Sequence, residues 1–247
     1  MKYGLYNGCS FMWGDELIDP LNTRFSRLMC DDLGIEEINL SIKGASNSRI
    51  YRTTIDYLTN CETTPEYVII AWSGIDRFEF LYPYKQDKHD DYYMQCSRSR
   101  LDQPEFAPVR NSLYGYVKDI ASDPLDCINT LTYMNGMQLL CSSMNIPLIQ
   151  IQFAHVHRQV LSSILNEMTY SVKKNKIKNY IKSKVESLHN YSRYGLTNEM
   201  DLLKMASDIK DVDIWPNFYG HPRERSQIAF KDFMIDKLKE HYDFRVQ

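Results

Sequence analysis

The stretch YVIIAW, residues 67–72, decides the fold class. All six residues are apolar and three of them are β-branched, which is typical of a strand buried on both faces of a sheet. Further strand candidates occur at Lys2–Tyr6, Glu37–Ile42, Pro147–Phe153 and Ile209–Ile214. Because helical patterns separate these segments, we predict an α/β fold with a doubly wound parallel sheet of about five strands.

The segments between the strands carry apolar residues at helical spacing. They are Leu21–Leu33, Ser46–Leu58, a segment from Asp123 to about Met144, and Pro222–His241. Asp123 is expected to cap the third helix, with Pro124 at its first position. Residues 78–122, rich in tyrosine, and the mostly helical residues 155–208 are interpreted as insertions. We therefore predict one flavodoxin-like, three-layer α/β/α domain over residues 1–247.

The composition excludes several classes of protein. The 247 residues include 29 Lys and Arg against 32 Asp and Glu, which gives a net charge of −3. A nucleic-acid partner is not expected, because phosphate-binding proteins usually present a basic face. No apolar run approaches the ~18–20 residues that cross a bilayer, so no membrane association is expected. The first residues carry no apolar signal segment, which predicts a cytoplasmic protein with six reduced cysteines.

Chemically useful residues follow the ends of the predicted strands. Ser10 follows the first strand, Gly44 follows the second, and His221 precedes the last helix. The carboxyl ends of parallel strands meet at one edge of a sheet, so these residues are expected to converge. A glycine without Cβ lets its backbone N–H approach a substrate oxygen. A serine, a histidine and backbone N–H donors at one edge are suited to acyl transfer.

Four blocks of this sequence resemble those of the Ser-Gly-Asn-His (SGNH, or GDSL-like) hydrolases, with the divergent bacteriophage members the most similar. The blocks are GCSFMWGDEL from residue 8, the set Asn39, Gly44, Ser46 and Asn47, YVIIAWSGIDR from residue 67, and GHPRERSQIAF from residue 220. The resemblance implies a serine esterase without metal or cofactor that removes a small acyl group from a carbohydrate-like carrier. It implies Ser10 as nucleophile and His221 as general base. The Ser10, Gly44 and Asn47 positions would form the oxyanion hole.

Two positions depart from the family pattern. The third block of the family contains an asparagine that donates to the oxyanion, whereas this chain has Ile75, whose side chain has no donor. Asn47, Ser73 and Arg77 are candidate substitutes. The last block of the family has an aspartate three residues before the histidine, where this chain has Phe218. Asp213 or a backbone carbonyl is the candidate replacement for orienting the histidine.

These departures keep a second hypothesis open. A catalytically degraded SGNH-fold protein would serve as a binding or structural module, in a homo-oligomer or in a virus particle if the chain is phage-encoded. A third hypothesis, a flavodoxin-like nucleotide binder, lacks both common glycine-rich phosphate motifs. His155 and His157 could bind a metal ion from one strand face, but no third ligand is evident, so no metal is expected. The lysines of residues 173–184 are interpreted as a solvated helix face.

Overall fold

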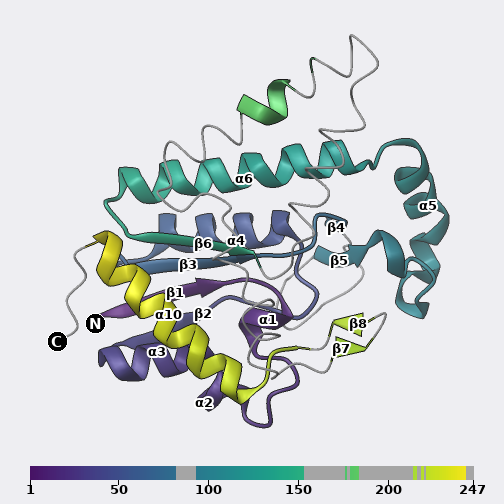
Figure 1. Ribbon diagram of the computed structural model, residues 1–247. Coiled ribbons are helices and arrows are strands. Elements are labelled where there is room, and N and C mark those ends of the chain that lie inside the picture. The colour runs from purple at the N-terminus through teal and green to yellow at the C-terminus, as the bar shows by residue number, and fades with distance from the viewer. Residues whose placement is uncertain are drawn as a thin grey trace.

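The computed structural model describes residues 1–81, 93–152, 176, 179–183, 214–215, 218–219 and 221–242. Four strands form a parallel sheet in the order β2-β1-β3-β6 (Figure 1). They are β1 (Tyr3–Asn7), β2 (Glu36–Asn39), β3 (Tyr67–Trp72) and β6 (Leu148–Gln152). The predicted α/β fold class with a doubly wound parallel sheet is confirmed.

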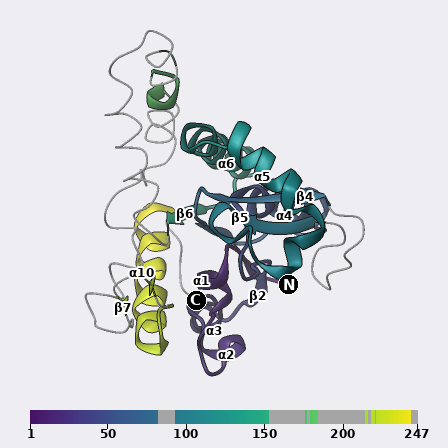
Figure 2. The same ribbon diagram turned by 90° about the vertical axis from the view of Figure 1, so that its right-hand side faces the viewer.

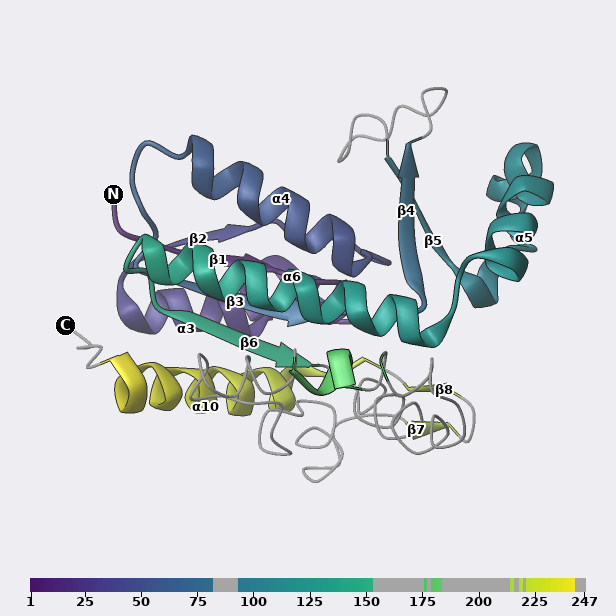
Figure 3. The ribbon, with the colours of Figure 1, turned by 90° about the horizontal axis from the view of Figure 1, so that it is seen from above.

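Helices cover both faces of this sheet. Figures 1 and 3 show α3 (Phe25–Leu33) and α10 (Glu224–Tyr242) on one face, with α4 (Asn47–Asn60) and α6 (Asp123–Ser143) on the other. Alternate residues of β3 enter the two cores. Tyr67, Ile69 and Ala71 pack with Phe230 and Met234 of α10, whereas Val68, Ile70 and Trp72 pack with residues of α4 and α6. This two-sided burial explains the unbroken apolar run in the sequence.

The strand order reverses direction at β1, which is the position where ligands bind in such sheets. The chain goes from β1 to β2 on one side of β1, and then crosses to β3 on its other side. Gly8 follows β1 and lies close to Met12 and Ala71. A Cβ on Gly8 would stand 2.7 Å from the Met12 Cβ and 3.0 Å from the Ala71 Cβ, so only glycine fits. The residues that follow Gly8 therefore emerge at the switch point.

Several predicted element boundaries were wrong. The helix expected at Leu21–Leu33 is two helices, α2 (Pro20–Thr23) and α3, because Arg24 adopts an extended backbone between them. Ser122, not Asp123, caps α6, since its side chain accepts the Leu125 N–H at 3.4 Å. β2 ends at Asn39 rather than Ile42.

The predicted last strand, Ile209–Ile214, is described only at Ile214. That residue belongs to β7 (Ile214–Trp215), which pairs with β8 (Phe218–Tyr219) in a separate antiparallel sheet. In the part of the chain that the structure describes, the parallel sheet thus has four strands rather than about five.

The tyrosine-rich segment contains regular structure in its described part. A hairpin of β4 (Arg77–Leu81) and β5 (Tyr93–Ser97) leads to two short 3₁₀ helices, η1 (Arg98–Arg100) and η2 (Pro104–Val109), and to α5 (Arg110–Asp119). It has a small core of its own, made of Met94, Cys96, Leu101, Phe106 and Leu113. Figure 2 shows the hairpin and α5 on the side of α4 and α6. Of the predicted helical insertion at 155–208, only residue 176 and residues 179–183 are described, and they are helical.

The structure also bears on membrane association and on the cysteines. Within the described ranges, no helix has both the length and the apolar character needed to cross a bilayer. All six cysteines are free thiols, and Cys9 is buried in the core beneath α4 and α6, as expected for a packing residue beside Ser10.

Candidate active site

Ser10 opens α1 (Ser10–Trp13), a single helical turn that begins just after β1. Cys9 precedes it with extended backbone, and the Trp13 N–H donates to the Cys9 carbonyl at 3.0 Å. The N–H groups of Gly14 and Asp15 donate to the Ser10 carbonyl at 3.1 and 2.9 Å. The Ser10 N–H has no acceptor within α1, because the first N–H groups of a helix never do. The turn therefore fixes Ser10 at the carboxyl end of β1.

His221 reaches Ser10 from the other end of the chain. Its Nε2 lies 2.8 Å from the Ser10 Oγ, although 211 residues separate the two in sequence. The imidazole also packs against the Phe11 ring, with the ring centroids 4.7 Å apart. Pro222 follows His221, and α10 begins at Glu224, so the histidine stands directly before the last helix. The structure thus brings together the serine and the histidine that the sequence singled out.

Glu16 lies on the far side of the imidazole and was missed by the sequence analysis. Its Oε1 is 3.1 Å from His221 Nδ1, and its Oε2 accepts the His221 backbone N–H at 3.2 Å. Burial raises the pKa of the Glu16 carboxyl, but the adjacent His221 side chain and the hydrogen bond from the His221 backbone N–H lower it more, so the net pKa is lowered. A carboxylate beside the second ring nitrogen is the arrangement that orients a histidine base.

A second carboxylate lies near the other ring nitrogen. Asp15 Oδ2 is 4.0 Å from His221 Nε2, and Asp15 also forms an ion pair with Lys43. Asp213, the sequence-based candidate for orienting the histidine, lies outside the described residues. Phe218 belongs to β8.

Gly44 lies in the loop between β2 and α4, with a positive φ of +77°. No heavy atom stands within 4 Å of the place where a Cβ would be, so conformation rather than crowding requires glycine here. Ser46 caps α4 two residues later, since its Oγ accepts the Arg49 N–H at 3.2 Å. The Ser46 N–H in turn donates to Gln95 Oε1 of the hairpin at 2.9 Å.

Asn47, Ser73 and Arg77 form one hydrogen-bonded unit. The Asn47 amide donates to the Ser73 carbonyl and to Thr130 Oγ1, both at 3.1 Å, and its Oδ1 accepts the Ser73 N–H at 2.7 Å. Arg77 Nη1 donates to Ser73 Oγ at 2.9 Å. Both hydrogens of the Asn47 amide are therefore used within the protein, where Asn47 fixes the backbone after β3. Ile75, two residues after Ser73, is buried.

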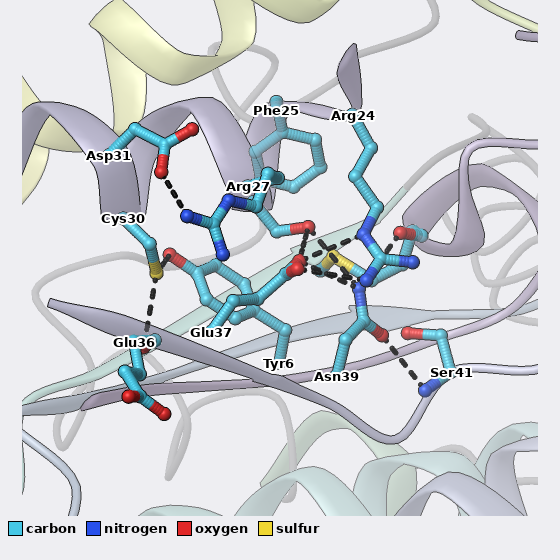
Figure 4. Close-up of polar contacts among 12 residues, drawn as sticks. Tyr6, Arg24, Phe25, Arg27, Cys30, Asp31, Glu36, Glu37, Asn39 and Ser41 are labelled. Atoms are coloured by element: carbon cyan, nitrogen blue, oxygen red, sulfur yellow. Dashed lines mark hydrogen bonds and ion pairs between the residues drawn. The ribbon is translucent and has the colours of Figure 1, made fainter. Parts of the chain in front are cut away.

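Arg24, Glu37 and Asn39 belong to a largely buried polar network (Figure 4). Arg24 binds Glu37 through two hydrogen bonds of 2.9 and 2.8 Å, and the two side chains are only 7% and 5% exposed. Ser26 and Asn39 also donate to the Glu37 carboxylate. The Asn39 amide reaches the Met12 carbonyl of α1 at 3.3 Å. The network therefore ties the turn that carries Ser10 to the end of β2.

Metal binding finds no support in the described part of the chain, where no three His, Cys, Asp or Glu side chains are grouped as a metal ion requires. The His155 and His157 pair lies outside the described residues.

The fold resembles those of several solved structures. The esterase EstA from Pseudoalteromonas sp. matches with a TM-score of 0.50 and 14% identity over 99% of this chain and 100% of its own. TesA matches with a TM-score of 0.51 and 13% identity over 97% and 99%. A member of the lipolytic protein G-D-S-L family from Veillonella parvula has a TM-score of 0.48 and 11% identity over 99% and 100%. The chain shares the overall fold of EstA and TesA.

At these identities, the likeness shows the fold alone. No protein-family model matches the sequence, and no curated protein matches it either. None of the three structures bears on the bacteriophage origin that the sequence resemblance implied. Fold alone does not fix an activity, which depends on the geometry of the site at Ser10 and His221.

Proposed function

We propose that this protein is a serine ester hydrolase with Ser10 as nucleophile and His221 as general base. The observation that carries the proposal is the distance of 2.8 Å between Ser10 Oγ and His221 Nε2. A serine within hydrogen-bonding reach of a histidine, at the carboxyl end of a strand, is the arrangement needed for acyl transfer. EstA, which shares the fold, is an esterase, and this supports the same reaction class.

In the proposed reaction, Ser10 Oγ attacks the ester carbonyl while His221 Nε2 takes the hydroxyl proton. The tetrahedral intermediate then collapses, the C–O bond to the alcohol breaks, and the imidazolium returns its proton to the leaving oxygen. Water attacks the resulting acyl-serine with His221 again as base. The acid leaves, and Ser10 regains its proton.

The developing oxyanion would be stabilised by backbone N–H groups. The proposed donors are the backbone N–H groups of Ser10 and Gly44. Ser10 lies at the start of α1, and Gly44 has a backbone conformation that only glycine adopts readily. Asn47 is assigned a supporting role instead, because both of its amide hydrogens are bonded to Ser73 and Thr130. Ile75 adds no donor, so the site works with backbone groups where the family also uses an asparagine.

A small acyl group is the proposed substrate portion. Ser10 is only 6% exposed, which favours a compact acyl group over a bulky one. A carbohydrate-like carrier is the expectation from the sequence resemblance, and the esterase neighbours are compatible with small esters.

The alternative is a binding or structural module that has lost catalysis, alone, as a homo-oligomer or in a virus particle. The observation that favours it is Ile75 at the position of the family's oxyanion-binding asparagine. Loss of one oxyanion donor typically lowers kcat by ~10²–10³-fold, which would leave a weak but measurable enzyme.

The test is hydrolysis of p-nitrophenyl acetate by the wild type and by Ser10→Ala and His221→Ala, with folding checked by circular dichroism. We expect turnover by the wild type and a loss of at least ~10³-fold in each variant. Rates equal to the buffer blank for all three folded proteins would favour the binding module. Equal turnover by the wild type and Ser10→Ala would exclude Ser10 as nucleophile.

A further inference from the structure

A histidine base needs a partner at Nδ1 that holds its ring in the productive tautomer and orientation. The family's aspartate position is occupied by Phe218, which cannot accept a hydrogen bond. We propose that Glu16, on the loop after α1, is the residue that positions His221. The proposal rests on the hydrolase function above and moves the third member of the catalytic group from the last block of the sequence to the first.

Glu16 contacts the same histidine twice. Oε1 lies 3.1 Å from Nδ1, and Oε2 accepts the His221 backbone N–H at 3.2 Å. One carboxylate therefore lies against both the ring and the backbone that carries it, and the backbone contact is an aligned hydrogen bond. The two contacts together restrict the rotation of the imidazole more than either one alone.

The loop that carries Glu16 is held at several points. The N–H groups of Gly14 and Asp15 bond to the Ser10 carbonyl, and the Leu17 N–H bonds to the Gly14 carbonyl. The Ile18 N–H reaches Glu224 Oε1, in the first turn of α10, at 3.4 Å. The loop is thus attached to Ser10 on one side and to the helix that follows His221 on the other. Nucleophile and carboxylate are positioned by one turn.

The backbone at Glu16 supports a functional reason for the residue. Its φ is +67°, in the left-handed region that side chains other than Asn, Asp and Gly rarely adopt. Such strain persists where the surrounding structure or the function requires the residue. The Glu16 side chain is 55% exposed, so hydrophobic packing does not explain why a strained position holds a glutamate. The contacts of Glu16 with His221 explain it.

His221 Nδ1 and Glu16 Oε1 are close but not aligned as a hydrogen bond. Within the described residues, Nδ1 is buried and makes no hydrogen bond of good angle, although Oε1 is 3.1 Å away. Catalytic hydrogen bonds often tighten only when substrate binds. The other charges near the ring are Asp15, 4.0 Å from Nε2, and Lys43, which pairs with Asp15. Neither is placed to contact Nδ1 in this arrangement.

The first test follows the ring ¹⁵N signals of His221 by NMR without any substrate, so it is readable even if the protein hydrolyses no ester. The signals are assigned by their loss in His221→Ala. If Glu16 holds the hydrogen on Nδ1, then Glu16→Gln is expected to move these signals away from the tautomer protonated at Nδ1. Glu62 is an exposed glutamate before β3, and the matched control Glu62→Gln should leave the signals unchanged.

The second test measures kinetics and stability of the same variants. Glu16→Gln is expected to lower kcat by ~10²-fold or more, with KM changed by less than about threefold. Glu16→Gly relieves the left-handed strain, so its melting temperature should equal or exceed that of the wild type while kcat falls as in Glu16→Gln.

Three results would overturn the proposal. One is an unchanged set of His221 ring ¹⁵N signals in Glu16→Gln. Another is a change of those signals in Asp213→Asn rather than in Glu16→Gln. The third is wild-type kcat in Glu16→Gln while Ser10→Ala is inactive, which would leave the hydrolase assignment intact but remove Glu16 from it.

Discussion

Two groups of polar side chains, linked through Asn39 and α1, differ in burial and in hydrogen-bond geometry. Arg24 and Glu37 are almost fully buried, 13 residues apart, and joined by two aligned hydrogen bonds. Ser10, His221 and Glu16 lie at the edge of the sheet, join distant parts of the chain, and include a strained backbone and a poorly aligned Nδ1. The first group therefore has the features of a stabilising ion pair, and the second has the features expected of the proposed catalytic group.

The largest effect on stability is expected for Glu37→Gln. The change leaves the Arg24 guanidinium buried without a counter-charge, and breaking such a pair typically costs ~3–5 kcal/mol in the free energy of unfolding. We expect a loss near ~3 kcal/mol, because the Gln carbonyl still accepts one hydrogen bond. Urea unfolding followed by circular dichroism measures it.

Glu36→Gln is the control, since Glu36 is the exposed neighbour of Glu37 on β2. It should change stability by less than ~0.5 kcal/mol. Equal effects of the two substitutions would contradict the scaffold role of the Arg24–Glu37 pair. Ser10→Ala should also leave stability nearly unchanged, which sharpens the contrast between the two groups.

Asn39 is the link between the two groups, so its loss should affect both. Its amide contacts Glu37 Oε1 at 3.3 Å and the Met12 carbonyl of α1 at 3.3 Å. For Asn39→Ala we expect a loss of ~1–2 kcal/mol in stability and less than about a tenfold loss in kcat. Parallel unfolding and esterase assays measure the two effects. A large loss of activity with full stability would show that Asn39 belongs to the catalytic group.

A smaller, pH-dependent effect is expected at Asp126, which is partly buried beside Arg98. Burial raises the pKa of its carboxyl to about 6, more than Arg98, 3.3 Å away, lowers it. The folded pKa lies above the unfolded value of about 3.9, so ionisation destabilises the fold as pH rises through about 6. Asp126→Asn should therefore raise stability by ~1–2 kcal/mol at about pH 8 and by little at about pH 4.

Thermal melts of Asp126→Asn and wild type at both pH values measure this difference. Asp126 differs from Glu37 in its arginine partner. Arg98, beside Asp126, also binds Asp123, so Asp126 is not its sole counter-charge. An equal change at both pH values would show that packing, and not ionisation, explains the effect.

Part of this arrangement could be predicted from the sequence. The two-sided burial of β3 follows from the run at residues 67–72, and the convergence of Ser10 and His221 follows from their places after and before elements of a parallel sheet. Both depend on periodicity and strand order, which local sequence encodes well.

Other parts depend on contacts between distant residues. Nothing local marks Glu16 as left-handed or as a neighbour of His221, although the missing aspartate at Phe218 signals that another carboxylate is required. The break at Arg24 follows from its bond to Glu37, which helical periodicity cannot show. Asn47 was expected to face the oxyanion, but whether an amide is already bonded is decided by tertiary structure.

The most direct test of the central claim is labelling with a fluorophosphonate, followed by mass spectrometry of the modified peptide. This reagent forms a stable bond with a serine activated by an adjacent histidine. The account predicts one adduct, on Ser10, in the wild type and none in Ser10→Ala. A folded wild-type protein without any adduct, under conditions that label a known serine esterase, or an adduct at another residue, would contradict it.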